Sequence, residues 1–322
     1  MILAIDQGSS KTQALIGDDL GNILGVGTGE GACHFLVGMT AAMQAVDHAA
    51  YNALAAARLP REAITVVSAG IAGANWPEEY KALTNELQSR FPVARITVYN
   101  DCVAALFAGT RNKEAIVLCA GTSFNSAVVH DGQIIFIYNN YIEAMDEGGK
   151  GLATRALQGV FRSLTTMGLP TSLTEKALSF FGYKDTLSML LDFSRNSMSR
   201  PIKDFAPCVD EEAMRGDKVA LDVQYTFAQS LSRYATAALK RYEMTGSQAD
   251  VVLSGGVFKA RSPVMEDTIR MEIHRVAPLA RIVNAEFEPV VGAYVLAFDQ
   301  EQRGRVWKRV QIESHRLSLT RK

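Results

Sequence analysis

The 322-residue sequence lacks a strong net charge, a long apolar run and a cysteine motif. Its 33 lysines and arginines nearly balance 34 aspartates and glutamates, so it lacks the basic surface that nucleic-acid-binding proteins carry. No uninterrupted apolar segment has membrane-spanning length, and a strand pattern begins where a cleavable signal would lie. We therefore expect a cytoplasmic protein without a nucleic-acid or membrane partner.

The few cysteines are too widely spaced to predict a zinc site or an iron–sulfur cluster, because no C-x-x-C pair occurs. Isolated cysteines of this kind are typical of reduced thiols in a cytosolic protein. The sequence also lacks G-x-x-x-x-G-K-[ST], which excludes a phosphate loop that leads directly into a helix. The four cysteines are Cys33, Cys102, Cys119 and Cys208.

The beginning of the chain has a pattern that suits phosphate binding. An apolar run over residues 1–5 predicts a buried strand, which ends at Asp6 and is followed by a small, hydroxyl-rich turn at Gly8, Ser9 and Ser10. Residues of this size let backbone N–H groups approach an anion closely. Asp6 is placed to hold a divalent cation beside that anion. An ordinary glycine–serine hairpin turn explains the same residues equally well.

One order of elements is predicted twice along the chain. The order β-β-β-α-β-α-β-α fits residues 1–112 and returns over residues 113–322, with a helical insertion at about 151–245. Two such domains would place the turns after their first strands on a central cleft, whose closure would exclude water from a reactive phosphate. We therefore expect a duplicated α/β fold around a nucleotide cleft, which favours phosphoryl transfer over a one-domain binding module.

Two further turns follow predicted strands. The first is Gly121-Thr122-Ser123-Phe124-Asn125, and the second is Gly255-Gly256-Val257. Paired glycines allow the backbone to lie against a planar group such as a nucleotide base or its ribose. Each turn alone has an ordinary explanation, and only their recurrence in matching places favours nucleotide binding.

Two acidic stretches are candidates for contacts with a substrate hydroxyl. Asp101, after Asn100 at the end of a strand, would point into the cleft of an open α/β sheet and could accept the proton of an attacking hydroxyl. Capping of the next helix is the more common use of such an aspartate. Asp146 and Glu147 precede a glycine-rich helix entry and could bind vicinal sugar hydroxyls, although acids also favour helix N-termini for their own sake.

Taken together, these stretches resemble the BadF/BadG/BcrA/BcrD-type ATPase family, in its N-acetylglucosamine kinase-like branch. That family shares the ribonuclease H-like domains of actin, hexokinase and the heat-shock chaperones. The resemblance rests on motifs that run in order along nearly the whole chain: 6–12, Asn100-Asp101, Gly121-Thr122 with Asn125, 146–149, 255–257 and 291–293.

The resemblance implies an ATP- and Mg²⁺-dependent kinase that phosphorylates a hydroxyl of a small amino sugar, such as N-acetylglucosamine or glucosamine. It implies Asp101 as the general base, Asp6 as the Mg²⁺ residue and a homodimer. The residues that it implies for ATP binding are Gly8, Ser9, Ser10, Lys11, Thr12, Gly121, Thr122, Ser123, Gly255, Gly256 and Val257. The residues that it implies around the sugar are Cys33, Asn100, Asp101, Thr122, Asn125, Asp146 and Glu147.

Two departures from the family pattern keep other functions open. Cys33 stands where relatives carry a sugar-binding asparagine, and Phe124 would place a ring beside the γ-phosphate or the sugar. One alternative is an ATPase that activates a partner dehydratase or reductase, which would need cysteines for a shared cluster. Another is a sensor that binds sugar or ATP without turnover. The basic segment 303–322 is expected to be a solvated tail or to pack back on the first domain.

Overall fold

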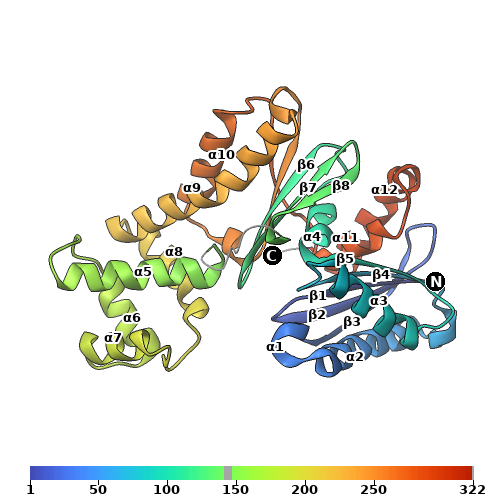
Figure 1. Ribbon diagram of the computed structural model, residues 1–322, viewed down its shortest axis with the longest axis horizontal. Helices are drawn as coiled ribbons and strands as arrows, with labels where there is room; N and C mark the ends of the chain where they lie inside the picture. The colour runs from blue at the N-terminus through green and yellow to red at the C-terminus, as the bar shows by residue number, and fades with distance from the viewer. Residues whose placement is uncertain (141–146, 321–322) are drawn as a thin grey trace.

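Two five-stranded sheets form the framework of the computed structural model, which describes residues 1–140 and 147–320 (Figure 1). Their strand orders are β3-β2-β1-β4-β5 and β10-β9-β6-β7-β8. Read from β8, the second sheet repeats the order of the first. The predicted duplication of a β-β-β-α-β-α-β-α unit is therefore confirmed.

The first sheet combines a hairpin meander with two parallel strands. β1 is antiparallel to β2 and parallel to β4, and it is buried along its whole length, as its apolar run predicts. The strands are β1 (Ile2–Gln7), β2 (Lys11–Gly17), β3 (Ile23–Glu30), β4 (Val66–Ile71) and β5 (Arg95–Asn100). The helices of this domain are α1 (His34–Val37), α2 (Met39–Ala57), α3 (Pro77–Arg90) and α4 (Asp101–Gly109).

The second sheet has the same plan, with β6 antiparallel to β7 and parallel to β9. Its strands are β6 (Ala115–Ala120), β7 (Phe124–His130), β8 (Gln133–Ile137), β9 (Asp250–Ser254) and β10 (Arg281–Asn284). Helices α10 (Val264–His274), α11 (Pro289–Leu296) and α12 (Gln300–Arg316) follow β9 and β10. We propose that the domain boundary lies between residues 112 and 113, in the connection from α4 to β6.

The helical insertion lies between β8 and β9. Figure 1 shows α5, α6 and α7 projecting away from the second sheet, with the long α9 leading back to it. Buried apolar side chains of these helices form one core cluster with the apolar side chains of β6 and β9. The helices are α5 (Gly149–Leu164), α6 (Leu173–Phe181), α7 (Thr186–Ser194), α8 (Ala206–Met214) and α9 (Lys218–Arg241).

The basic C-terminal segment forms helix α12 as far as Arg316, and the expectation of a solvated tail is wrong. An Asp299 capping box starts α12, and Trp307 is buried in the core that joins both domains. Arg309 Nε donates to Asn22 Oδ1 at 2.7 Å, and an Arg316 N–H donates to the carbonyl of Ile23 at 3.1 Å. The segment therefore packs back on the first domain, which was the other expectation. None of the described helices is long and apolar enough to cross a membrane.

Candidate active site

The C-terminal ends of β1, β4 and β5 bring the two predicted aspartates to one edge of the first sheet. Asp6 lies opposite Gly70 of β4, and Gly70 lies opposite Tyr99 of β5, two residues before Asp101. Asp6 is buried, with only 8% of its surface exposed, whereas Asp101 is half-buried as the first residue of α4. Parallel strand ends therefore place both carboxylates where open α/β sheets bind ligands.

The first turn joins β1 to β2. The Gly8 N–H donates to the Lys11 carbonyl at 2.9 Å, and the tip residues 9–11 are exposed. Thr12 is instead buried, and its hydroxyl donates to the carbonyl of Glu30 at 2.7 Å. The Thr12 hydroxyl therefore bonds to the neighbouring strand and is not directed at a phosphate. The prediction that the turn binds phosphate therefore rests on residues 8–11 and on the backbone.

The second turn is the equivalent of the first and touches it. The Gly121 N–H donates to the Ser123 carbonyl at 2.9 Å, which closes the turn between β6 and β7. Ser10 Oγ and Thr122 Oγ1 lie 3.3 Å apart, a hydrogen bond between residues 112 positions apart in the sequence. The two predicted phosphate turns therefore meet between the domains, as a duplicated fold requires.

Glycines allow close packing on both sides of the second turn. Gly255 has a φ of +108°, and a Cβ there would lie 2.1 Å from the carbonyl oxygen of Ala120. A Cβ on Gly148 would lie 2.5 Å from Thr122 O. The start of α5 also bonds to the turn, because the Gly149 N–H donates to the Gly121 carbonyl at 2.8 Å. The predicted third turn thus packs directly against the backbone of the second turn.

A second contact joins the first turn to the start of α11. Lys11 Nζ lies 2.9 Å from Glu288 Oε2, and Glu288 immediately precedes α11. The sequence analysis missed Glu288, although the Val291-Gly292-Ala293 motif that follows it was noted. Its carboxylate, together with Asp6 and Asp101, makes the cleft rich in negative charge.

The carboxylates of the cleft are held in an environment that opposes their ionisation. The pKa of Asp6 is raised to about 8, chiefly by burial and also by the charges of Asp101 and Glu288, while Lys11 lowers it. Burial likewise raises the pKa of Asp101 to about 6, against backbone N–H groups that lower it. Buried carboxylates near one another fit a divalent cation, which prefers oxygen ligands and would return Asp6 to its ionised form.

Asn100, rather than Asp101, is the N-cap of α4. The Cys102 N–H donates to Asn100 Oδ1 at 3.0 Å and also to Asp101 Oδ1 at 3.0 Å. Asn100 Nδ2 donates to the carbonyl of Ala74 at 3.1 Å and to Asn75 Oδ1 at 2.8 Å. Its amide is therefore satisfied within the protein, and only 1% of the residue is exposed. Its amide therefore has no donor left for the direct sugar contact that the resemblance implied.

Asn125 forms part of the same network. Its Nδ2 donates to Asn100 Oδ1 at 3.0 Å, and its Oδ1 accepts from the backbone N–H groups of Ser126 and Asn139. These bonds tie the start of β7 in the second domain to the end of β5 in the first. The predicted sugar contact of Asn125 thus competes with a structural role that the sequence did not indicate.

Three other predicted residues have different surroundings from those expected. The ring of Phe124 is buried against Tyr234, with centroids 4.7 Å apart, so the expectation that it borders the γ-phosphate or the sugar is wrong. The thiol of Cys33 is buried and donates to the carbonyl of Ala72 at 3.6 Å. Glu147 bonds to the Tyr234 hydroxyl and contributes to raising its pKa. Asp146 lies outside the described residues.

A cavity of about 470 Å³ opens beside the second turn. Gly121 and Thr122 line it, and so do Gly256 and Val257 of the third turn. Its opposite wall comes from the helical insertion, whose residues the sequence analysis did not single out because they belong to no recognisable motif. They include Lys203, Asp204, Pro207, Asp210 and Gln224.

Comparison with known families decides the assignment of this chain. Residues 3–297 match the BadF/BadG/BcrA/BcrD ATPase family. The chain belongs to this family.

Relatives of this family member include sugar kinases. The chain is 21% identical over 248 residues to N-acetylmuramic acid/N-acetylglucosamine kinase of Clostridium acetobutylicum, covering 73% of this chain and 78% of that protein. It is similar to the crystal structure of a putative N-acetylglucosamine kinase from Chromobacterium violaceum, with a TM-score of 0.71 at 21% identity, covering 92% of this chain and 98% of that chain.

A more distant structural likeness is a glucokinase of the ROK family from Streptomyces griseus, solved with glucose and AMPPNP. Its TM-score is 0.58 at 18% identity, with 92% of this chain and 98% of that chain covered. At this identity the likeness supports the fold alone, which is the fold of actin-like sugar kinases.

Proposed function

We propose that this protein is a sugar kinase that transfers the γ-phosphoryl group of ATP to a hydroxyl of an amino sugar such as N-acetylglucosamine or glucosamine. The observation that carries the proposal is the meeting of two equivalent hydroxyl-bearing turns, one from each domain, beside the strand ends that bear Asp6 and Asp101. Phosphoryl transfer depends mainly on positioning and on electrostatic stabilisation, and this cleft has residues for both.

Asp101 is the proposed general base. Its pKa of about 6 leaves the carboxylate ionised at neutral pH yet basic enough to accept a hydroxyl proton. One of its oxygens accepts from the Cys102 N–H, which fixes the side chain at the start of α4. A sugar hydroxyl beside the other oxygen would lose its proton as it attacks the terminal phosphorus.

The proposed nucleotide site combines the two turns with the 470 Å³ cavity. Backbone N–H groups of residues 9 and 10 and of residues 122 and 123 would bind the phosphates, and the backbone at Gly256 and Val257 would lie against the adenosine. Asp6 would hold Mg²⁺, whose charge would offset the phosphates and the carboxylates of the cleft. Lys11 would then exchange its ion pair with Glu288 for contact with a phosphate.

The activator alternative has less support from the structure. A shared metal cluster at a dimer interface needs exposed cysteine thiols, yet Cys33, Cys102 and Cys208 are buried. Burial also raises the pKa of all three thiols, which disfavours the thiolate that binds a metal. The relatives named as N-acetylglucosamine kinases favour the kinase over the sensor.

ATP consumption measured with Mg²⁺ across a panel of sugars tests this proposal. The panel holds glucosamine, N-acetylglucosamine, N-acetylmannosamine, glucose and mannose. We expect an amino sugar or its N-acetyl form to raise turnover at least tenfold above the sugar-free rate. ATP binding without stimulation by any sugar would contradict the kinase and would support the sensor.

Replacement of Asp6 by asparagine is expected to stabilise the metal-free protein at pH 8 and to abolish its response to Mg²⁺. Burial raises the pKa of Asp6 to about 8 from an ordinary 3.8, so the folded state holds this proton more tightly than the unfolded state does. The resulting stability is present below pH 4 and is lost as the pH rises through 8. We expect the metal-free Tm to fall by roughly 5 °C from pH 5 to pH 8, and to fall less in Asp6→Asn.

Calorimetry with and without Mg²⁺ at each pH measures this effect. Asp222→Asn is the matched control, because Asp222 is exposed on the helical insertion. An Mg²⁺-dependent rise in Tm that persists in Asp6→Asn would contradict the assignment of the cation to this residue.

A further inference from the structure

A second cavity lies at the N-terminal end of β6, the end opposite the second turn. Its volume is about 600 Å³, and Lys113 and Glu114, which precede β6, line it. β6 runs from there to Ala120, where the second turn begins. Since a strand rises about 3.3 Å per residue, the cavity is roughly 20 Å from that turn. It is therefore separate from the proposed nucleotide site.

Positively charged side chains from three segments face this cavity. Arg111 and Lys113 belong to the connection between the domains, Arg281 begins β10, and Arg303 lies in the first turn of α12. The guanidinium carbon of Arg111 lies over the ring of Trp307, 4.9 Å from its centroid. The guanidinium carbon of Arg303 lies over the ring of Phe107, 4.7 Å from its centroid. Aromatic rings thus hold both guanidinium groups in place.

These charges are poorly neutralised. Arg281 is paired with Asp250, but neither Arg111 nor Arg303 has a carboxylate partner within the described residues. Arg303 donates only to the backbone carbonyls of Val295 and Phe298. Burial lowers the pKa of both arginines, which reflects the cost of removing a cation from water, although Tyr99 and Asp299 partly offset this effect at Arg303.

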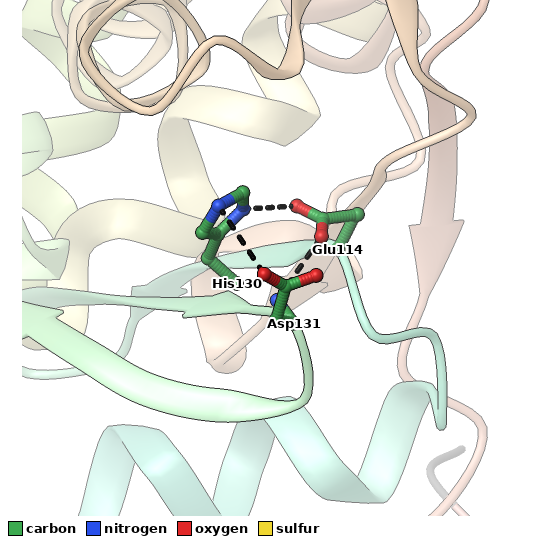
Figure 2. A group of neighbouring side chains, drawn as sticks. All are labelled: Glu114, His130 and Asp131. Atoms are coloured by element: carbon green, nitrogen blue, oxygen red, sulfur yellow. Dashed lines mark hydrogen bonds and ion pairs between the residues drawn. The ribbon is translucent and has the colours of Figure 1, made fainter.

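Glu114 is the one carboxylate on the described wall of the cavity, and both of its oxygens already have hydrogen-bond partners. Figure 2 shows His130 and Asp131 around it. His130 Nδ1 lies 2.7 Å from Glu114 Oε2, and the backbone N–H of Asp131 donates to Glu114 Oε1 at 3.0 Å. The bond to Glu114 raises the pKa of His130, which favours the imidazolium. Both oxygens are thus turned to the β7–β8 hairpin.

We propose that this cavity is a binding site for a phosphate-bearing small molecule, with Arg111, Lys113 and Arg303 as its cationic ligands. Guanidinium groups match the geometry of phosphate oxygens, and lysine adds a point charge. The volume suits a ligand as large as a hexose phosphate. The amides of Asn112, Gln248 and Gln300, also on the wall, suit its hydroxyls. The proposal does not depend on the kinase activity.

Titration calorimetry of the full-length protein at low ionic strength tests the site, with inorganic phosphate and glucose 6-phosphate as separate probes. The test variant is Arg111→Gln/Lys113→Gln, which leaves the packed Arg303 in place. Lys184→Gln/Lys240→Gln removes the same charge from exposed positions elsewhere. Lys11→Gln reports binding at the cleft. Hydrogen exchange of residues 110–114 and 300–304 locates the bound probe.

We expect at least one probe to bind and to protect both segments from exchange. Its affinity should fall at least tenfold in Arg111→Gln/Lys113→Gln and should not change in Lys184→Gln/Lys240→Gln. Tighter binding of glucose 6-phosphate than of phosphate would identify a sugar phosphate as the ligand class, and equal binding a free phosphate. Binding lost only in Lys11→Gln, or no binding of either probe at 10 mM, would overturn the proposal.

Discussion

Asp101→Asn is expected to lower sugar-dependent turnover by about a thousandfold while leaving ATP affinity within a factor of three. An amide cannot accept the hydroxyl proton, and a positioned base contributes roughly 10²–10⁴ to such a step. The amide oxygen can still accept from the Cys102 N–H, so α4 should keep its start. Steady-state kinetics and nucleotide titration measure the two quantities.

The pH profile separates this role from a structural one. Wild-type turnover should fall about tenfold per pH unit below 6, because the pKa of Asp101 is raised to about 6 by burial. The residual activity of Asp101→Asn should lack this limb, whereas Asp222→Asn should reproduce the wild-type profile. A variant that keeps both its rate and its acid limb would show that another group accepts the proton.

Gly255→Ala is expected to destabilise the protein by about 3 kcal/mol and to weaken nucleotide binding at least tenfold. The added Cβ would lie 2.1 Å from the Ala120 carbonyl oxygen and 2.8 Å from the Gly121 nitrogen, both of which are backbone atoms that cannot rotate away. The positive φ of Gly255 adds strain for any L-residue. The second turn would therefore have to move.

Gly256→Ala provides a matched control at the neighbouring position. No atom lies within 4 Å of a Cβ built on Gly256, so this variant should keep the wild-type stability. Urea unfolding and nucleotide titration of both variants make the comparison. Equal effects of the two substitutions, or none, would show that packing beneath the second turn does not determine nucleotide binding.

Much of the architecture could be predicted because the signals are local. Buried apolar runs followed by small polar turns indicate strand ends, and their repetition revealed the duplication. The same reasoning placed Asp6 and Asp101 each at the end of a strand, and the structure brings these strand ends to one edge of the first sheet. The C-terminal segment was harder, because its apolar residues are too sparse to reveal that Trp307 packs into the core between the domains.

Side-chain partners could not be predicted in the same way. Asn100 and Asn125 look like ligands in the sequence, yet they bond to one another because the two domains bring β5 and β7 together. Phe124 looks like an obstruction at the cleft, but as the first residue of a strand it alternates into the core beside Tyr234. Lys203 and Gln224 reach the cavity beside the second turn from the insertion, a relation that no local pattern carries.

The hydrogen bond between Ser10 and Thr122 has a consequence for the kinetics of ligand entry. Two hydroxyl oxygens 3.3 Å apart leave no room for a phosphate between them. If ATP binds there as proposed, the hydrogen bond between Ser10 and Thr122 must break first. The apparent affinity for ATP is then the intrinsic affinity multiplied by the fraction of molecules in which this bond is broken. Association would then be gated, with a rate that levels off at high nucleotide concentration instead of rising in proportion to it.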